Sequence, residues 1–136
     1  MIVVDSSALI EIILDQPMAA ACAEVLERED EFLISAGTMA ECLIVAIGHA
    51  AEQPLNDIFD RFGIQVVPLT EAGARAAARA YRRYGKKWHA AALNYGDCFA
   101  YALADERRCP LLFVGNDFAL TDVVPAIAKA EPPRQG

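Results

Sequence analysis

The sequence predicts a three-layer α/β/α sandwich with a mostly parallel sheet of four to five strands. Short, strongly apolar runs of strand length recur along the chain at residues 2–4, 32–34, 64–67 and 111–114. Helix-forming segments separate each run from the next, which is the order of parallel β-α units. The chain has 136 residues, of which 55% are hydrophobic. This length suits one compact domain with a core on both faces of a sheet.

The first half contains two such strands. Residues 2–4 form a β-branched run that ends at Asp5, and Ser6 and Ser7 are good starters for a helix over residues 8–14. Pro17 suits the first turn of a helix that extends to about residue 29. After the strand at 32–34 and a turn, Thr38 is expected to open a helix that ends near residue 48.

The second half continues the alternation. We expect a helix at 54–62 closed by Gly63, a strand at 64–67, and an alanine-rich helix at 70–84. Residues 86–95 have no clear preference. A helix at 97–107 and a strand at 111–114 follow, and residues 123–124 are expected to add a short fifth strand. Residues 1–130 are predicted to form a single domain, and residues 131–136 a flexible tail.

The charge is unevenly distributed. The net charge is −7, which argues against a molecule that binds nucleic acid over its whole surface. Residues 1–74 hold 13 acids and two bases, whereas residues 75–136 hold ten bases and six acids. Six of the 12 bases fall between Arg75 and Lys87. The sequence therefore predicts an acidic body with one basic stretch that can meet a polyanion locally.

Cysteine spacing and hydropathy indicate a cytoplasmic protein. The cysteines at positions 22, 42, 98 and 109 form no C-x-x-C pair, which excludes the usual zinc knuckle and redox motifs. We expect reduced, mostly buried thiols. No basic segment precedes the first apolar run, and no apolar stretch reaches the ~20 residues of a membrane span. No membrane partner is expected.

Four acids follow strands or begin helices. Asp5 and Asp117 each follow a predicted strand, and Glu41 and Asp97 begin predicted helices. Each has a purely structural alternative: Asp5 and Asp97 as helix caps, Glu41 as the partner of Thr38 in a capping box, and Asp117 as a turn residue. Ligands of parallel α/β sheets bind beyond the carboxyl ends of the strands. All four acids are expected at that edge.

Converging carboxylates need a counter-charge. Glu41 is the only charged residue between Glu31 and Glu52 and lies among apolar neighbours, where a carboxylate should be paired or bound to a cation. Several carboxylates at one place repel one another unless protons or a divalent cation relieve the repulsion. Oxygen ligands suit Mg²⁺ or Mn²⁺. The acids therefore predict a metal site for phosphate chemistry, and Thr121 and Asp122 are expected to support or cap it.

Four segments, in order along nearly the whole chain, resemble the motifs of PIN-domain nucleases, and of the VapC toxins in particular. They are residues 2–9 (IVVDSSAL), 34–41 (ISAGTMAE), 97–104 (DCFAYALA) and 112–118 (LFVGNDF). The resemblance implies a metal held by Asp5, Glu41, Asp97 and Asp117, which would be the catalytic residues. It also implies that Ser7 hydrogen-bonds near the metal and that Asn116 can share the role of Asp117.

The resemblance also implies a function. A protein of this kind is the toxin of a type II toxin–antitoxin system, an Mg²⁺- or Mn²⁺-dependent endoribonuclease that cleaves transfer or ribosomal RNA. Water, activated by the metal, attacks the phosphodiester and leaves a 5′-phosphate and a 3′-hydroxyl. The implied partner is a VapB-like antitoxin whose tail enters the acidic site, and a homodimer is expected.

The basic stretch is a candidate RNA-binding segment. Arg82, Arg83, Lys86 and Lys87 could contact phosphates, and Trp88 could stack on a base. The alternative is a solvated helix end, since cations also suit a helix C-terminus.

Rival functions make different demands on the sequence. A phosphatase of the haloacid-dehalogenase type also has an Asp after its first strand, but it would require a second Asp at position 7, which is Ser7 here. A receiver-like signalling domain would want adjacent acids near the first strand and a late lysine, and neither is evident. A catalytically inactive PIN-like binding module would need no metal, whereas all four acidic positions are present here.

Overall fold

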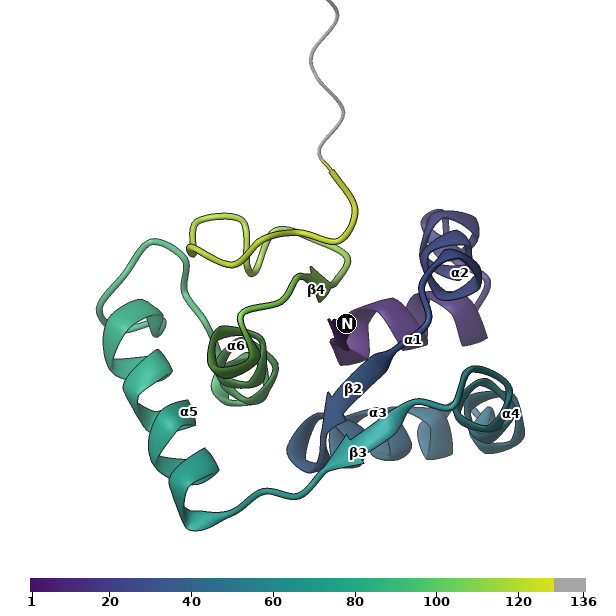
Figure 1. Cartoon of the computed structure of the whole chain (residues 1–136), viewed down its shortest axis with the longest axis horizontal. Coiled ribbons are helices and arrows are strands. Elements are labelled where there is room, and N and C mark those ends of the chain that lie inside the picture. The colour runs from purple at the N-terminus through teal and green to yellow at the C-terminus, as the bar shows by residue number, and fades with distance from the viewer. Residues whose placement is uncertain (129–136) are drawn as a thin grey trace, which may run out of the picture.

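The computed structural model describes residues 1–128 and contains four short strands and six helices (Figure 1). The order along the chain is β1 (Ile2–Val4), α1 (Ser6–Ile13), α2 (Ala19–Arg28), β2 (Phe32–Ser35), α3 (Ala36–Gly48), α4 (Glu52–Phe62), β3 (Gln65–Val67), α5 (Glu71–Tyr84), α6 (Tyr95–Arg107) and β4 (Leu111–Leu112). The predicted tail, 131–136, lies outside the described residues.

The strands form one sheet in the order β3-β2-β1-β4, and every neighbouring pair is parallel. The expected fifth strand at residues 123–124 is wrong. Leu111 N–H donates to Val124 O, and Ala126 N–H donates to Leu111 O, which forms a single bridge centred on Pro125. No further pair extends this bridge within the described residues, so the segment does not become a strand.

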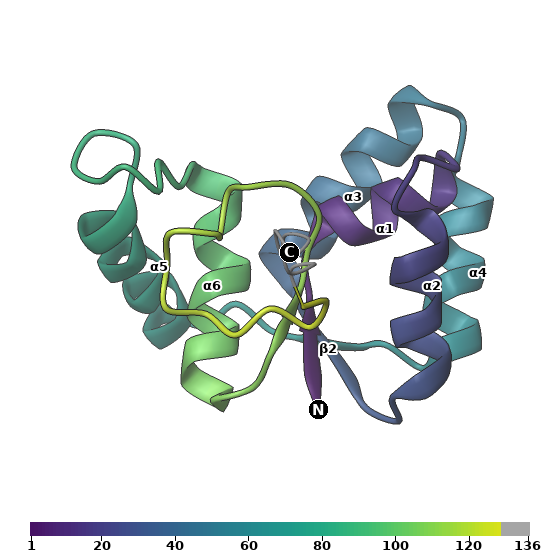
Figure 2. The same cartoon turned by 90° about the horizontal axis from the view of Figure 1, so that it is seen from above.

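The sheet separates two helical layers, which confirms the predicted three-layer sandwich. Val3, Leu33 and Leu111 face a core shared with α5 and α6. Their neighbours along the strands, such as Val4 and Ile34, face a second core shared with α1, α2, α3 and α4. This alternation follows from the two-residue period of a strand. Figures 1 and 2 show α5 and α6 on one side of the sheet and α1, α2 and α4 on the other.

Helix starts follow local capping chemistry, which the sequence predicted in part. Asp5 caps α1 and Thr70 caps α5, each through a side-chain oxygen that accepts a backbone N–H. Thr38 does not open α3, because Ser35 caps that helix and Thr38 lies buried inside it. Asn94 caps α6, so this helix starts two residues before Asp97. Pro17 precedes α2 rather than forming its first turn.

The segment between α5 and α6 is a loop of turns. It is closed at its base by one bridge between Gly85 and Leu93. Among the helices of the described residues, none has the length and apolarity needed to cross a membrane.

Candidate metal centre and its surroundings

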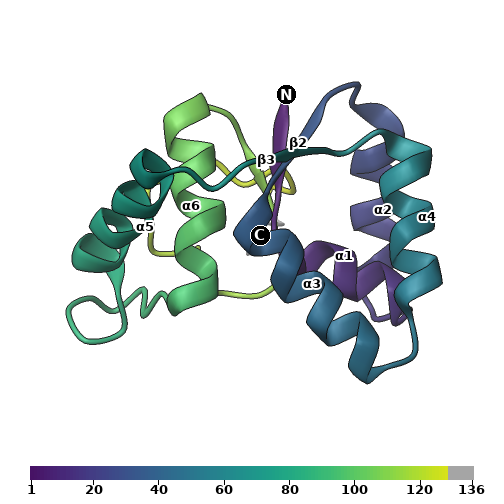
Figure 3. The ribbon, with the colours of Figure 1, turned by 90° about the horizontal axis from the view of Figure 1, so that it is seen from below.

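The four candidate acids come from four separate elements at the carboxyl edge of the sheet. Asp5 directly follows β1, Glu41 lies in the second turn of α3, Asp97 lies in the first turn of α6, and Asp117 lies in the segment after β4. In Figure 2 the segment after β4 runs between the start of α6 and the starts of α1 and α3. Figure 3 shows α3 and α6 side by side from the opposite direction. The parallel topology therefore brings together residues up to 112 positions apart in sequence.

Asp5 is the most deeply buried of the acids, with 3% of its surface exposed. Its Oδ2 accepts hydrogen bonds from Ser7 N–H at 3.1 Å and from Ser7 Oγ at 2.7 Å. Its Oδ1 is buried without any hydrogen-bond partner. Burial, with a further contribution from the negative charge of Glu41, raises the pKa of Asp5 to about 6. A buried carboxylate oxygen without a donor is a position where a cation is strongly favoured.

Asp97 is held by a reciprocal capping box. Its Oδ2 accepts from Asn94 N–H at 3.0 Å, and Asn94 Oδ1 accepts from Asp97 N–H at 2.9 Å. Burial raises the pKa of Asp97 to about 7, and the negative charges of Asp117, Asp5 and Glu41 add to this rise. Asp97 therefore lies within electrostatic reach of the other three carboxylates. Asp97 thus performs a structural role and remains available to the site with its other oxygen.

Glu41 does not form the predicted capping box with Thr38. It lies beyond the first turn of α3 and accepts a hydrogen bond from Ser6 Oγ at the start of α1. This contact joins two helices that are far apart in sequence. The Thr38 hydroxyl oxygen is instead buried without a partner. The apolar surroundings that mark Glu41 in the sequence are those of a crossing between helices.

Ser7 connects two of the acid-bearing elements. Its hydroxyl donates to Asp5 Oδ2 and accepts from Val114 N–H at 3.0 Å. Val114 lies in the segment that leads to Asp117. Both hydrogen-bonding capacities of one hydroxyl therefore bind the end of β1 to the segment after β4.

The acids fit a divalent cation but do not stand ready-made around one. Within residues 1–128, no three His, Cys, Asp or Glu side chains are already arranged as metal ligands. Asp5, Glu41 and Asp97 each use one oxygen in a hydrogen bond to the protein. The unpartnered oxygen of Asp5 and the raised pKa values of Asp5 and Asp97 are conditions that a bound cation relieves. An all-oxygen set of this kind suits a hard ion such as Mg²⁺.

The residues expected to support the metal ligands diverge in location. Asn116 is exposed in the turn before Asp117, and Thr121 Oγ1 donates to Phe118 O at 2.8 Å within the same segment. The predicted role of Asp122 beside the metal ligands is wrong. Its carboxylate accepts a hydrogen bond from Tyr101 Oη at 2.5 Å and forms an ion pair with Arg83 at 3.4 Å. Its described contacts therefore join α5, α6 and the C-terminal segment rather than supporting the acids.

The basic segment is only partly free to meet RNA. Arg82, Lys86 and Lys87 are exposed, and Trp88 has 66% of its surface exposed. Arg83 is engaged with Asp122, and its guanidinium lies 4.7 Å from the ring centre of Tyr84. Arg83 therefore has a structural role that the sequence pattern did not predict.

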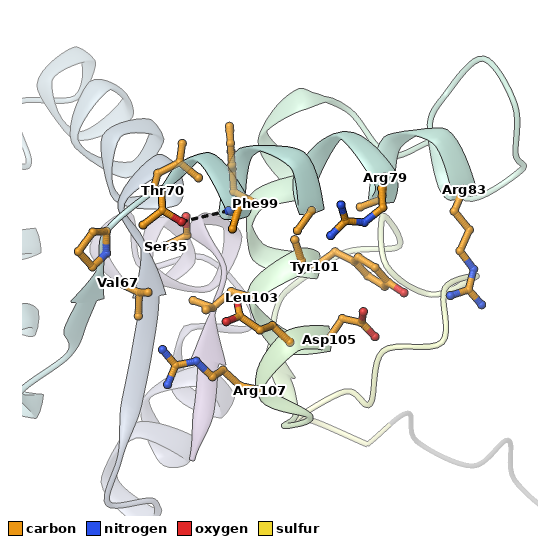
Figure 4. Close-up of a pocket in the computed structure, with 18 residues that line it drawn as sticks. Ser35, Val67, Thr70, Arg79, Arg83, Phe99, Tyr101, Leu103, Asp105 and Arg107 are labelled. Atoms are coloured by element: carbon orange, nitrogen blue, oxygen red, sulfur yellow. Dashed lines mark hydrogen bonds between the residues drawn. The ribbon is translucent and has the colours of Figure 1, made fainter.

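A groove between α5 and α6 lies apart from the four acids. Its volume is about 610 Å³, and α5, α6 and the ends of β2 and β3 enclose it (Figure 4). Arg79, Arg83 and Arg107 line it together with Asp105 and Glu106, so it carries charges of both signs. Its walls also include the small side chains of Ala72, Ala76 and Ala102, which leave the space open. Neither its charge nor its shape indicates a reaction.

Sequence reasoning missed two residues that position the acids, Ser6 and Asn94. Asn94 had a detectable signal, since Asn followed three residues later by an acid is a variant of the capping box. Ser6 had none, because adjacent serines after a strand read equally well as helix starters. Its partner Glu41 lies 35 positions away.

The sequence is similar to known proteins over most of its length. Residues 2–124 match the PIN domain family. The ribonuclease VapC28 of Mycobacterium tuberculosis is 41% identical over 129 residues, which cover 92% of this chain and 97% of that protein. The same share of each chain aligns with a VapC ribonuclease of Mycobacterium bovis, also at 41% identity.

Solved structures share the fold at low sequence identity. VapC20 of Mycobacterium tuberculosis, described as a toxin that cleaves the sarcin-ricin loop, superimposes with a TM-score of 0.74 at 15% identity, over 91% of this chain and 97% of that one. A toxin–antitoxin complex from Klebsiella pneumoniae gives a TM-score of 0.71 at 19% identity, over 93% and 98% of the two chains. The phosphatase and inactive-module alternatives are not favoured. This chain belongs to the PIN-domain family, among its VapC ribonucleases.

Proposed function

We propose that this protein is the toxin of a type II toxin–antitoxin system, a cytoplasmic endoribonuclease that requires Mg²⁺ or Mn²⁺. The observation that carries the proposal is the buried Oδ1 of Asp5, which has no hydrogen-bond partner, in a carboxylate within electrostatic reach of Glu41 and Asp97. Asp5, Glu41, Asp97 and Asp117 would hold the metal. Family membership supports the nuclease activity.

The four acids would have different roles in binding the metal. Asp5 and Asp97, buried and fixed by Ser7 and Asn94, would provide the rigid ligands. Asp117 is exposed, so it would complete the site from the solvent side. A divalent ion bound there would activate water and neutralise charge on the scissile phosphate. Without the ion, the carboxylates repel the RNA backbone, which makes cleavage strictly metal-dependent.

The RNA would enter past the loop between α5 and α6. Lys86 and Lys87 would contact phosphates, and the exposed Trp88 ring would stack on a base. Arg82 is exposed on the last turn of α5 and would add a further phosphate contact. We propose a structured transfer or ribosomal RNA as substrate.

An antitoxin partner agrees with the related toxin–antitoxin complexes. We propose a VapB-like protein that brings a basic side chain to the four acids, because this acidic site favours any cation. We also propose a homodimer. Ile44 and Ile47 lie one turn apart on α3 and are both largely exposed, which is unusual for side chains of this size. Light scattering of the Ile44→Glu variant, expected to shift from dimer to monomer, tests this surface.

The nuclease proposal is tested with purified, antitoxin-free protein and total cellular RNA. Discrete fragments are expected with Mg²⁺ or Mn²⁺ and not with EDTA. The Asp97→Asn variant should be inactive. Asp105→Asn is the matched control, because Asp105 is an exposed acid two turns further along the same helix. Cleavage that survives EDTA or the Asp97→Asn substitution would contradict the proposal.

A further inference from the structure

Two glycines allow α3 and α6 to cross closely beside the acids. Gly37 is the second residue of α3, and Gly96 is the second residue of α6. A Cβ on Gly37 would lie 2.8 Å from the ring of Phe99 on α6. A Cβ on Gly96 would overlap Glu41 Oε2 and lie 2.9 Å from Glu41 Cδ on α3. Phe99 of α6 thus packs against Gly37 of α3, and Glu41 of α3 packs against Gly96 of α6.

Neither glycine is required by its backbone conformation. The glycines with positive φ in the described residues are Gly63 and Gly115, whereas Gly37 and Gly96 have ordinary helical geometry. Alanine is normally more favourable than glycine inside a helix. The requirement at both positions is therefore one of space, and at Gly96 the space is filled by a carboxylate.

The Glu41 carboxylate is held from two sides. Its Oε1 accepts a hydrogen bond from Ser6 Oγ, and its Oε2 lies against Gly96, the residue directly before Asp97. Ser6 itself directly follows Asp5. The two residues that contact Glu41 are thus the chain neighbours of the two buried aspartates.

We propose that Ser6 and Gly96 are positioning residues that clamp Glu41 between Asp5 and Asp97, so that its carboxylate reaches the metal. This rests on the metal site of the proposed function. The hydroxyl of Ser6 fixes one oxygen, and the missing side chain of Gly96 leaves room for the other beside Asp97. A glutamate has three rotatable bonds, so without both contacts its carboxylate would spread over many positions.

The two glycines give a matched pair of variants with opposite expectations. Gly96→Ala displaces only the flexible end of Glu41, so the metal-free protein should melt at the same temperature as the wild type or higher. Its Mn²⁺ affinity should fall by about 10- to 100-fold, as for other residues that orient metal ligands. Gly37→Ala drives a methyl group into the buried ring of Phe99, so it should lower the melting temperature.

The experiment measures Mn²⁺ affinity by calorimetric titration and melting temperature by circular dichroism on antitoxin-free protein. Ser6→Ala should weaken Mn²⁺ binding about tenfold, and Ser6→Thr, which keeps the hydroxyl, should restore it. Gly48→Ala controls for a glycine substitution in α3, because a Cβ there meets no atom within 4 Å. Asp97→Asn should abolish binding and so defines the specific site.

The outcomes separate the clamp from the metal site. Normal Mn²⁺ affinity in Gly96→Ala and Ser6→Ala, together with loss in Asp97→Asn, would overturn the clamp and leave the proposed function intact. A wild-type protein that binds no Mn²⁺ would overturn both. Weaker binding in Gly96→Ala with an unchanged or higher melting temperature would establish the clamp, since a merely structural glycine would lower stability.

Discussion

The acidic cluster and the basic segment differ in how firmly the fold holds them. Asp5 and Asp97 are buried, and one oxygen of each accepts a hydrogen bond, from Ser7 and from Asn94 respectively. Lys86, Lys87 and Trp88 project from an irregular loop and are exposed. Asp5 and Asp97 are therefore held in place before any metal binds, whereas the proposed recognition surface remains free to adapt to its ligand.

The largest expected effect is at Asp5. Asp5→Asn should reduce RNA cleavage by at least about 10³-fold, because it removes the charge of a proposed metal ligand and with it several kcal/mol of transition-state stabilisation. The fold should survive, since Asn is an equally good helix cap and its amide oxygen can still accept from Ser7. Cleavage rate and far-UV circular dichroism measure the two effects. Substantial cleavage by folded Asp5→Asn protein would remove Asp5 from the reaction.

The basic segment should respond more weakly. The double variant Lys86→Ala, Lys87→Ala is expected to lower RNA affinity by about tenfold at moderate salt and to flatten its salt dependence, because fewer counterions are released. Trp88→Ala should reduce affinity further without changing the salt slope, since stacking is not ionic. Both are tested by measuring RNA binding by fluorescence anisotropy at several salt concentrations, with every protein also carrying Asp97→Asn so that the RNA is not cleaved. An unchanged salt slope in the double variant would place the RNA elsewhere.

Ser7 links the two elements that carry Asp5 and Asp117, so its loss should affect stability as well as activity. Ser7→Ala leaves Val114 N–H without its acceptor and removes one of the two hydrogen bonds to Asp5 Oδ2, since only the one from Ser7 N–H remains. We expect a loss of about 1–3 kcal/mol in the free energy of unfolding, measured by urea denaturation. Ser7→Thr, which retains the hydroxyl, should recover most of it. Equal stability of all three proteins would show that Ser7 is replaceable.

The pH dependence of stability in the metal-free protein tests the two buried aspartates together. The pKa values of Asp5 and Asp97 rise to about 6 and about 7, from 3.8. The folded protein therefore binds more protons than the unfolded chain between about pH 4 and 7, so stability falls as the pH rises through this window. The melting temperature should drop by roughly ten degrees between pH 5 and 8.

Two variations sharpen the pH experiment. Asp97→Asn should flatten the decline, because one of the two titrating groups is gone. Saturating Mn²⁺ should also flatten it, because the cation stabilises the charged carboxylates. A metal-free protein whose melting temperature rises from pH 5 to 8 would contradict the raised pKa values of these buried acids.

The placement of the acids on the fold could be predicted from the sequence, whereas the contacts around them could not. Asp5 and Asp117 were found because they follow strands, and parallel strands end at one edge. The alternatives of helix cap and metal ligand proved compatible for Asp5, which is the N-cap of α1 and also has an unpartnered oxygen. Thr38 and Asp122 were misassigned, because their partners lie on other elements.

By itself, the sequence determined the alternation of strands and helices, the parallel sheet and the four acidic positions. These properties depend on local periodicity and on the order of elements, which a single chain displays directly. Only the tertiary structure decided that Ser35 rather than Thr38 caps α3, and that Arg83 forms an ion pair with Asp122. It alone also placed Glu41 against Gly96. Such contacts depend on how closely two helices approach, and residues distant in sequence carry no pattern that reveals it.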